Sequence, residues 1–177
     1  MKSEEMFKGF AVAAGKGRFD EKIQLGGEPH DCKVSSLDTH GAMSAFEFTG
    51  SGGGPRHLHH EQDEWIYVVD GELEIELDGE RRRLATGESV FIPRKVKHVW
   101  VSDGDHPAKI LNVYQPAGKM EDFFRKLGSY RTEEPIHEVL TIDQFRRLFE
   151  EHGMDLTGPP LTGEWKVSDE GRIVRIS

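Results

Sequence analysis

Short segments of alternating apolar and polar residues occupy residues 32–114 of the chain. Alternation with a period of two is typical of a strand that buries one face, and Gly, Asp and Pro residues separate these segments as turns. The predicted strands cover residues 45–48, 65–69, 73–77, 90–92, 98–101 and 110–114. The pattern predicts an all-β domain, either an antiparallel sandwich or a barrel.

The period changes after Pro116, where residues 119–127 and 141–152 carry apolar side chains at the spacing of amphipathic helices. Thr141 is a suitable N-cap for the second helix, and Gly153 is a suitable stop. The predicted buried face of this helix consists of Phe145, Leu148 and Phe149. The C-terminal part of the chain is therefore expected to add one or two helices to the β domain.

A length of 177 residues fits a single domain in three parts. Residues 1–30 are expected to form an N-terminal arm or edge strands, and residues 31–118 the barrel core. Residues 119–177 are expected to form C-terminal helices and a tail packed on the barrel. Within this last part, residues 164–176 are expected to form a hairpin.

The amino-acid composition of the chain limits the kinds of molecule that it is expected to bind. The chain has 23 Lys and Arg residues against 32 Asp and Glu residues, a formal net charge of −9, which argues against nucleic-acid and anionic-membrane binding. Cys32 is the only cysteine, so an intramolecular disulfide and a cysteine-based zinc site are excluded. Because no segment approaches the roughly 18 consecutive apolar residues of a membrane helix, we expect a cytoplasmic protein.

The segment that begins at His57 contains the strongest candidates for metal ligands. Residues two apart in a strand share a face, so His57 and His59 are expected to point into one cavity. Glu64 returns on the next strand after a polar turn, and His98 on a later strand is a fourth candidate ligand. Imidazoles with one carboxylate suit one divalent transition metal, and Fe, Mn, Ni, Co, Cu and Zn all accept this donor set.

The spacing of these residues resembles that of the cupin superfamily. The first cupin motif is matched by His57, His59, Glu64 and Gly71, and the second by Gly87, Pro93 and His98. Two positions depart from the second motif: Lys95 stands where the motif prefers Gly, and Ser102 where it prefers Asn. Neither is a ligand position, so the departure at Lys95 bears on the shape of the turn and leaves the metal ligands in place.

The resemblance implies a double-stranded β-helix, the jelly-roll barrel, with the metal inside it held by His57, His59, Glu64 and His98. Segments after Pro116 are similar to the tail of bacterial single-domain cupins described as quercetin-dioxygenase-like. Such proteins imply a homodimer that pairs through sheet edges and swapped arms, for which residues 1–30 are available.

Four protein ligands leave one or two positions open on a five- or six-coordinate ion, as a catalytic site requires. One carboxylate and three neutral imidazoles leave a divalent ion with a net charge of +1, which favours an anionic substrate. The leading hypothesis is a quercetinase-type dioxygenase that acts on a small enolisable or phenolic compound and O2, with Glu64 as the catalytic base. The alternatives are a metal-dependent isomerase or lyase of a small sugar or keto acid, and a non-catalytic binding module for a small molecule.

Strand parity suggests which side chains line the substrate pocket. If Glu64 and His98 point inward, residues two and four further along their strands do so as well. The predicted pocket residues are Phe46, Phe48, Ile66, Val68, Trp100 and Tyr114. Arg94, Lys95 and Lys97 precede His98 and either steer an anion to the pocket or form an ordinary solvated loop.

Overall fold

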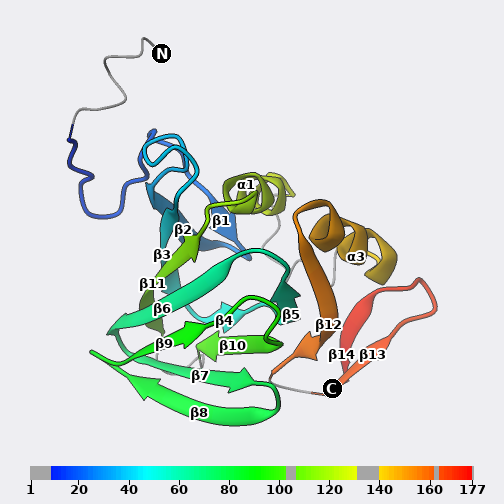
Figure 1. Ribbon diagram of the computed structural model, residues 1–177. Coiled ribbons are helices and arrows are strands. Elements are labelled where there is room, and N and C mark those ends of the chain that lie inside the picture. Colours follow the sequence, from blue (N-terminus) through cyan, green and yellow to red (C-terminus); the bar gives the residue numbers. More distant parts are fainter. Residues whose placement is uncertain (1–8, 103–106, 131–139, 162–163, 177) are drawn as a thin grey trace.

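The computed structural model describes residues 9–102, 107–130, 140–161 and 164–176, and its main feature is a jelly-roll barrel of two antiparallel sheets (Figure 1). The first sheet has the strand order β1 (Gln24–Leu25), β2 (Glu28–Val34), β3 (Ser44–Gly50), β11 (Ala108–Gln115), β6 (Asp63–Asp70) and β9 (Ser89–Ile92). The second has the order β12 (Met154–Pro160), β5 (Pro55–His59), β10 (His98–Ser102), β7 (Glu72–Leu77) and β8 (Glu80–Ala85), with β4 (Gly52–Gly53) paired to β10. A separate hairpin joins β13 (Glu164–Val167) to β14 (Ile173–Ile176), as expected for residues 164–176. The predicted all-β jelly roll is confirmed.

Because apolar and polar residues alternate along the predicted strands, each strand has an apolar inner face and a more polar outer face. The inner face of the first sheet carries Phe46, Phe48, Ile66, Val68, Ile110 and Tyr114, none more than 4% exposed. Their neighbours in sequence, such as Glu47 and Tyr67, retain solvent contact. The period-two pattern therefore identified these strands and the residues that share a face, and the structure shows which face is buried.

Among the strands that were not predicted, β8 and β12 lack a sequence signal for different reasons. β8 has the sequence ERRRLA, in which charge hides any alternation, and it is held by cross-strand ion pairs such as Arg81 with Glu76 at 3.2 Å. β12 contains Gly158, Pro159 and Pro160, which weaken a strand signal, but it lies at the edge of its sheet, where proline is tolerated. Because β12 pairs with β5, the second sheet extends beyond the span of 31–118 expected for the barrel.

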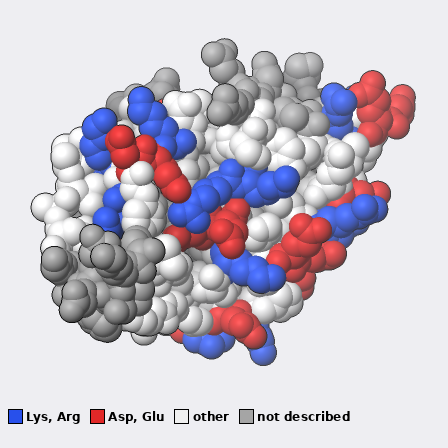
Figure 2. All heavy atoms as spheres, turned by 90° about the horizontal axis from the view of Figure 1, so that it is seen from above, with Lys and Arg blue, Asp and Glu red and all other residues white. Residues whose placement is uncertain are grey.

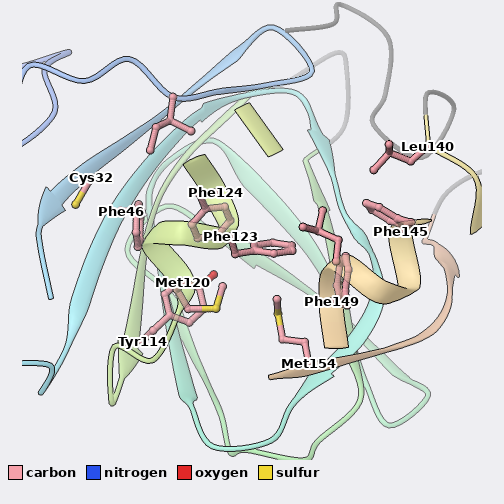
Figure 3. Packing of buried hydrophobic residues seen from close by; sticks show 12 residues of the cluster. Cys32, Phe46, Tyr114, Met120, Phe123, Phe124, Leu140, Phe145, Phe149 and Met154 are labelled. Carbon is pink, nitrogen blue, oxygen red and sulfur yellow. The ribbon is translucent and has the colours of Figure 1, made fainter. Parts of the chain in front are cut away.

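The helices α1 (Met120–Ser129) and α3 (Ile142–Glu151) lie at the upper end of the barrel in Figure 1. Thr141 caps α3 as predicted: its side chain accepts a hydrogen bond from the backbone of Gln144, and the Gln144 side chain accepts one from the Thr141 backbone. Figure 3 shows Phe123 of α1 and Phe149 of α3 pointing toward each other, with ring centroids 5.0 Å apart. The helices thus close this end of the barrel with an aromatic cluster.

The buried apolar side chains form two clusters. The helix-side cluster joins the two helices to the inner face of the barrel and includes Phe46, Tyr114, Phe124, Phe149 and Met154 (Figure 3). The barrel-floor cluster includes Phe48, Ile66, Val68, Ile75 and Ile110, with Trp100 packed against it. The polar residues described next lie on the strands that carry these clusters.

Charges of both signs are mixed on the surface. Lys and Arg side chains lie beside Asp and Glu side chains on the face seen in Figure 2. In the parts of the chain that the structure describes, neither helix has the length and apolar character needed to cross a membrane.

Candidate metal centre

The four candidate ligands come from three strands and from both sheets. His57 and His59 lie on β5 and His98 on β10, directly opposite His57 in the strand register. Glu64 lies on β6 of the facing sheet and completes the group from across the barrel. One ligand atom from each residue lies within 4.8 Å of the others. The structure therefore brings together the four residues that the spacing predicted.

Backbone carbonyls fix the orientation of two of the imidazole rings. Nδ1 of His57 donates to the carbonyl oxygen of Pro55 at 2.8 Å, and Nδ1 of His98 donates to that of Val96 at 3.0 Å. With the proton held on Nδ1, Nε2 of each neutral ring keeps its lone pair for a metal ion.

The inward-facing atoms of the cluster lie close to one another but make no directed hydrogen bond. Oε2 of Glu64 lies 3.1 Å from Nε2 of His98 and 3.4 Å from Nε2 of His59, without forming a directed hydrogen bond to either. Glu64, His59 and His98 are at most 2% exposed, so water does not reach these atoms from the surface. Buried polar atoms are rarely left unpaired, and a divalent ion among three imidazoles and a carboxylate would satisfy one inward-facing atom of each residue. The residues present fit such an ion.

The other oxygen of Glu64 is held from the neighbouring strand. Asn112 on β11 donates from its side-chain amide to Oε1 at 2.7 Å, and the hydroxyl group of Tyr114 donates to the same atom at 3.3 Å. Glu64 lies opposite Tyr114 in the register of β6 and β11. These contacts fix the carboxylate so that Oε2 faces the imidazoles.

The surroundings shift the pKa values within the cluster. Desolvation holds the pKa of His57 well below its usual value, and the nearby His98 and His59 rings add to this. Burial alone would raise the pKa of Glu64, but its contacts with His59 and His98 outweigh burial and hold that pKa well below the usual range. Burial and the Glu64 carboxylate raise the pKa of Tyr114 well above its usual value. Glu64 is therefore a carboxylate at neutral pH, and Tyr114 stays protonated as a donor.

The turn before His98 keeps its shape although the motif glycine is absent. Lys95 adopts a left-handed backbone conformation with φ of 69°. Its backbone N–H donates to the carbonyl oxygen of His59 at 2.7 Å, which ties the turn to the ligand strand. Arg94 forms a paired contact with Asp63 at 2.8 and 3.0 Å, so the carboxylate next to Glu64 already neutralises this cation. The departure at Lys95 thus leaves the turn intact.

The predicted pocket residues all face the barrel interior but separate into two groups. Phe48, Ile66, Val68 and Trp100 belong to the barrel-floor cluster, where the rings of Phe48 and Trp100 lie 5.4 Å apart. Phe46 and Tyr114 belong to the helix-side cluster, and the Tyr114 ring lies 5.5 Å from His59. Their contact with a substrate stays a prediction.

Sequence reasoning missed two residues near this centre. Asn112 shares the inner face with Ile110 and Tyr114, which strand parity indicates, but parity does not reveal its contact with Glu64. Phe149 of α3 places its ring 5.5 Å from that of His57, and it was predicted only as a core residue. His57 is the only one of the four ligands that retains partial solvent exposure, so α3 borders the more open side of the cluster.

Comparison with known proteins agrees with the motif spacing and the fold. Residues 45–114 match the family model described as the cupin domain. Residues 45–114 thus carry a cupin domain. The part of this cupin that matches contains all four candidate ligands.

Relatives of this cupin carry different functional names. It is 33% identical over 79 residues to polyketide synthase CurC of Streptomyces cyaneus, covering 45% of this chain and 49% of that protein. It is 26% identical over 121 residues to quercetin 2,3-dioxygenase of Bacillus subtilis, covering 67% of this chain and 34% of the relative. This cupin thus matches about half of the first relative's length and a third of the second's.

A solved structure supports the fold alone. An RmlC-like cupin from Shewanella frigidimarina aligns with a TM-score of 0.51 at 23% identity, covering 66% of this chain and 96% of that one. At this identity the likeness establishes the barrel and does not define the reaction.

Proposed function

We propose that this protein is a metal-dependent enzyme that acts with O2 on a small enolisable or phenolic compound. The observation that carries the proposal is the buried group of three imidazoles and one carboxylate, whose inward atoms lack hydrogen-bond partners. A divalent ion bound there would act as a Lewis acid with a net charge of +1 and would favour an anionic oxygen of the substrate.

The state of Glu64 limits the protons that it can accept. Asn112 and Tyr114 occupy Oε1, so Oε2 is the oxygen that would bind the ion and, when the carboxylate is released from the ion, accept a proton from a substrate hydroxyl group. Because the pKa of Glu64 is well below its usual range, the carboxylate is a weak base. A weak base accepts a proton from an enol or a phenol far more readily than from an alcohol. This favours an enolisable or phenolic substrate over a sugar.

The surrounding side chains suit a flat compound. His57 lies against Phe149, and His59 against Tyr114, each with ring centroids 5.5 Å apart. Aromatic walls beside a few fixed polar groups are typical of small-molecule sites. The similarity to a quercetin 2,3-dioxygenase supports the proposal that the protein is an oxygenase.

A second candidate is a ring closure or isomerisation that needs no O2. The similarity to polyketide synthase CurC favours it, since a polyketone is also enolisable and would meet the same base. The two candidates share a substrate class and differ in whether O2 is consumed.

The test is O2 uptake by the purified protein, loaded separately with each of Fe²⁺, Mn²⁺, Ni²⁺, Co²⁺, Cu²⁺ and Zn²⁺. The substrates are quercetin and 1,3-diphenylpropane-1,3-dione. We expect O2 consumption with at least one ion, loss of that activity in Glu64→Gln, and retention in Glu74→Gln, which makes the same change on the outer face of β7. Turnover that is equal without O2 would select the second candidate, and binding without turnover would overturn both.

A further inference from the structure

His30 is a buried titratable residue that the proposed chemistry does not use. It lies on β2, paired in register with Phe48, and only 2% of it is exposed. Three aromatic rings surround the imidazole: Phe46 at 5.2 Å, Phe48 at 6.2 Å and Phe124 at 4.1 Å between centroids. The ring therefore faces the barrel interior, inside an aromatic box.

Both ring nitrogens of His30 lie in that box without a hydrogen-bond partner from any residue that the structure describes. A neutral imidazole offers one donor and one acceptor. Leaving a buried donor or acceptor unpaired lowers the stability of the folded protein. Burial lowers the pKa of His30 to about 3, so protonation does not relieve this cost at neutral pH.

Two further unpaired polar atoms lie on the inner face of the same sheet. They are Oγ of Ser44 on β3 and Oδ1 of Asn112 on β11. Ser44 lies opposite Tyr114 in the register, and Asn112 lies opposite Phe46. The inner face therefore presents polar atoms between aromatic rings, on the strands that run from His30 to Glu64.

A continuous series of ring contacts joins His30 to the metal centre. The Phe46 ring lies 6.1 Å from the Tyr114 ring, which in turn lies 5.5 Å from His59. The Glu64 carboxylate is the one charged group that influences the pKa of His30, and it acts against the effect of burial. His30 is thus joined to the candidate ligands through packed aromatic rings of the barrel interior.

We infer that His30 binds an oxygen atom of the substrate, and that this oxygen lies at the far end of the substrate from the atoms that bind the metal. His30 thereby selects flat compounds that carry a second hydroxyl or carbonyl group. This inference rests on the proposed function and narrows its substrate class. A hydroxyl group can both donate and accept, so it pairs with either nitrogen of the neutral ring.

The test compares two flavonols that share one chelating unit. Quercetin carries further hydroxyl groups on both ends of the molecule, and 3-hydroxyflavone carries none. Binding to the metal-loaded protein is measured without O2 through the absorbance shift of the flavonol. In His30→Leu we expect quercetin to bind about three- to tenfold more weakly, as for loss of one neutral hydrogen bond. Affinity for 3-hydroxyflavone should stay unchanged, and His30→Gln, which restores a donor and an acceptor, should recover part of the loss.

A second measurement does not depend on any flavonol. Because His30→Leu removes two unpaired nitrogens at similar volume, the Tm of the metal-loaded protein without ligand should stay the same or rise. A fall in Tm of more than about 5 °C would show that the nitrogens are satisfied within the protein and would overturn the inference.

The remaining outcomes separate this inference from the proposed function. If the wild-type protein binds both flavonols and His30→Leu weakens both equally or neither, the inference fails while the proposed function stands. If the wild-type protein binds neither flavonol, the proposed function fails for this class of compound, and the inference that depends on it falls too.

Discussion

Asn112 donates a 2.7 Å hydrogen bond from its side-chain amide to Oε1 of Glu64, between two adjacent strands of one sheet. The remaining carboxylate oxygen is thereby directed at the imidazoles of the facing sheet. Residues that orient a ligand in this way tune metal affinity although they do not touch the ion.

Replacing Asn112 by Leu should therefore weaken metal binding. Asn112→Leu keeps the side-chain size but removes the donor, and the expected loss of affinity is about 10- to 100-fold. Tyr114→Phe removes the longer bond of 3.3 Å and should have a smaller effect. Affinity is measured by competition with a chromophoric chelator. Equal affinity in Asn112→Leu and wild type would show that Glu64 needs no support from β11.

Lys95 offers a prediction about stability. Its φ of 69° lies in the left-handed region, which glycine adopts without strain and a lysine does not. Lys95→Gly should therefore raise the free energy of unfolding by about 1 kcal/mol and Tm by about 2–4 °C. The backbone bond to His59 is kept, so metal affinity should not change.

Lys97 is the matched control, since it lies in the same basic segment without a positive φ. Lys97→Gly adds chain entropy to the unfolded state with no strain to relieve, so it should lower Tm. If both glycine substitutions lower Tm, the conformation at Lys95 is not strained.

Local patterns in the sequence predicted most of the fold and all four candidate ligands. The two-residue spacing of His57 and His59 places both rings on one face of β5, as predicted, because it depends only on strand geometry. The capping of α3 by Thr141 is equally local.

Features that depend on distant segments were not predictable in this way. The contact of Asn112 with Glu64 joins residues 48 positions apart, and the box around His30 is closed by Phe124 of α1. β12 becomes a strand because β5 offers it a partner, against the local preference of its two prolines. These features depend on contacts between segments that are far apart in the sequence, and a single sequence does not reveal such contacts.

Metal removal should destabilise the protein. An ion that binds only the folded state at 100 times its Kd adds about 2.7 kcal/mol, so a chelator should lower Tm by roughly 5–10 °C. Glu64→Gln should abolish this shift. His60→Ala should keep it, because His60 contacts Asp155 at 3.0 Å and is not one of the four clustered residues. A chelator effect of the same size in Glu64→Gln would place the ion elsewhere.

His30 makes the stability of the protein depend on pH. Burial lowers its pKa from 6.5 to about 3, although the Glu64 carboxylate acts in the other direction. Between these values the unfolded chain binds a proton that the folded protein does not, so stability falls as the pH decreases from 6.5 towards 3. At pH 5 this single group should cost about 2 kcal/mol relative to pH 7.

His30→Leu removes this titration and leaves every other group in place. The free energy of unfolding, measured in urea at pH 7 and pH 5, should therefore fall about 2 kcal/mol further in wild type than in His30→Leu. Loss of metal at pH 5 affects both proteins alike and cancels in the comparison. If the two proteins lose stability equally between pH 7 and pH 5, the imidazole of His30 is able to take up a proton in the folded state, and the aromatic box does not exclude charge.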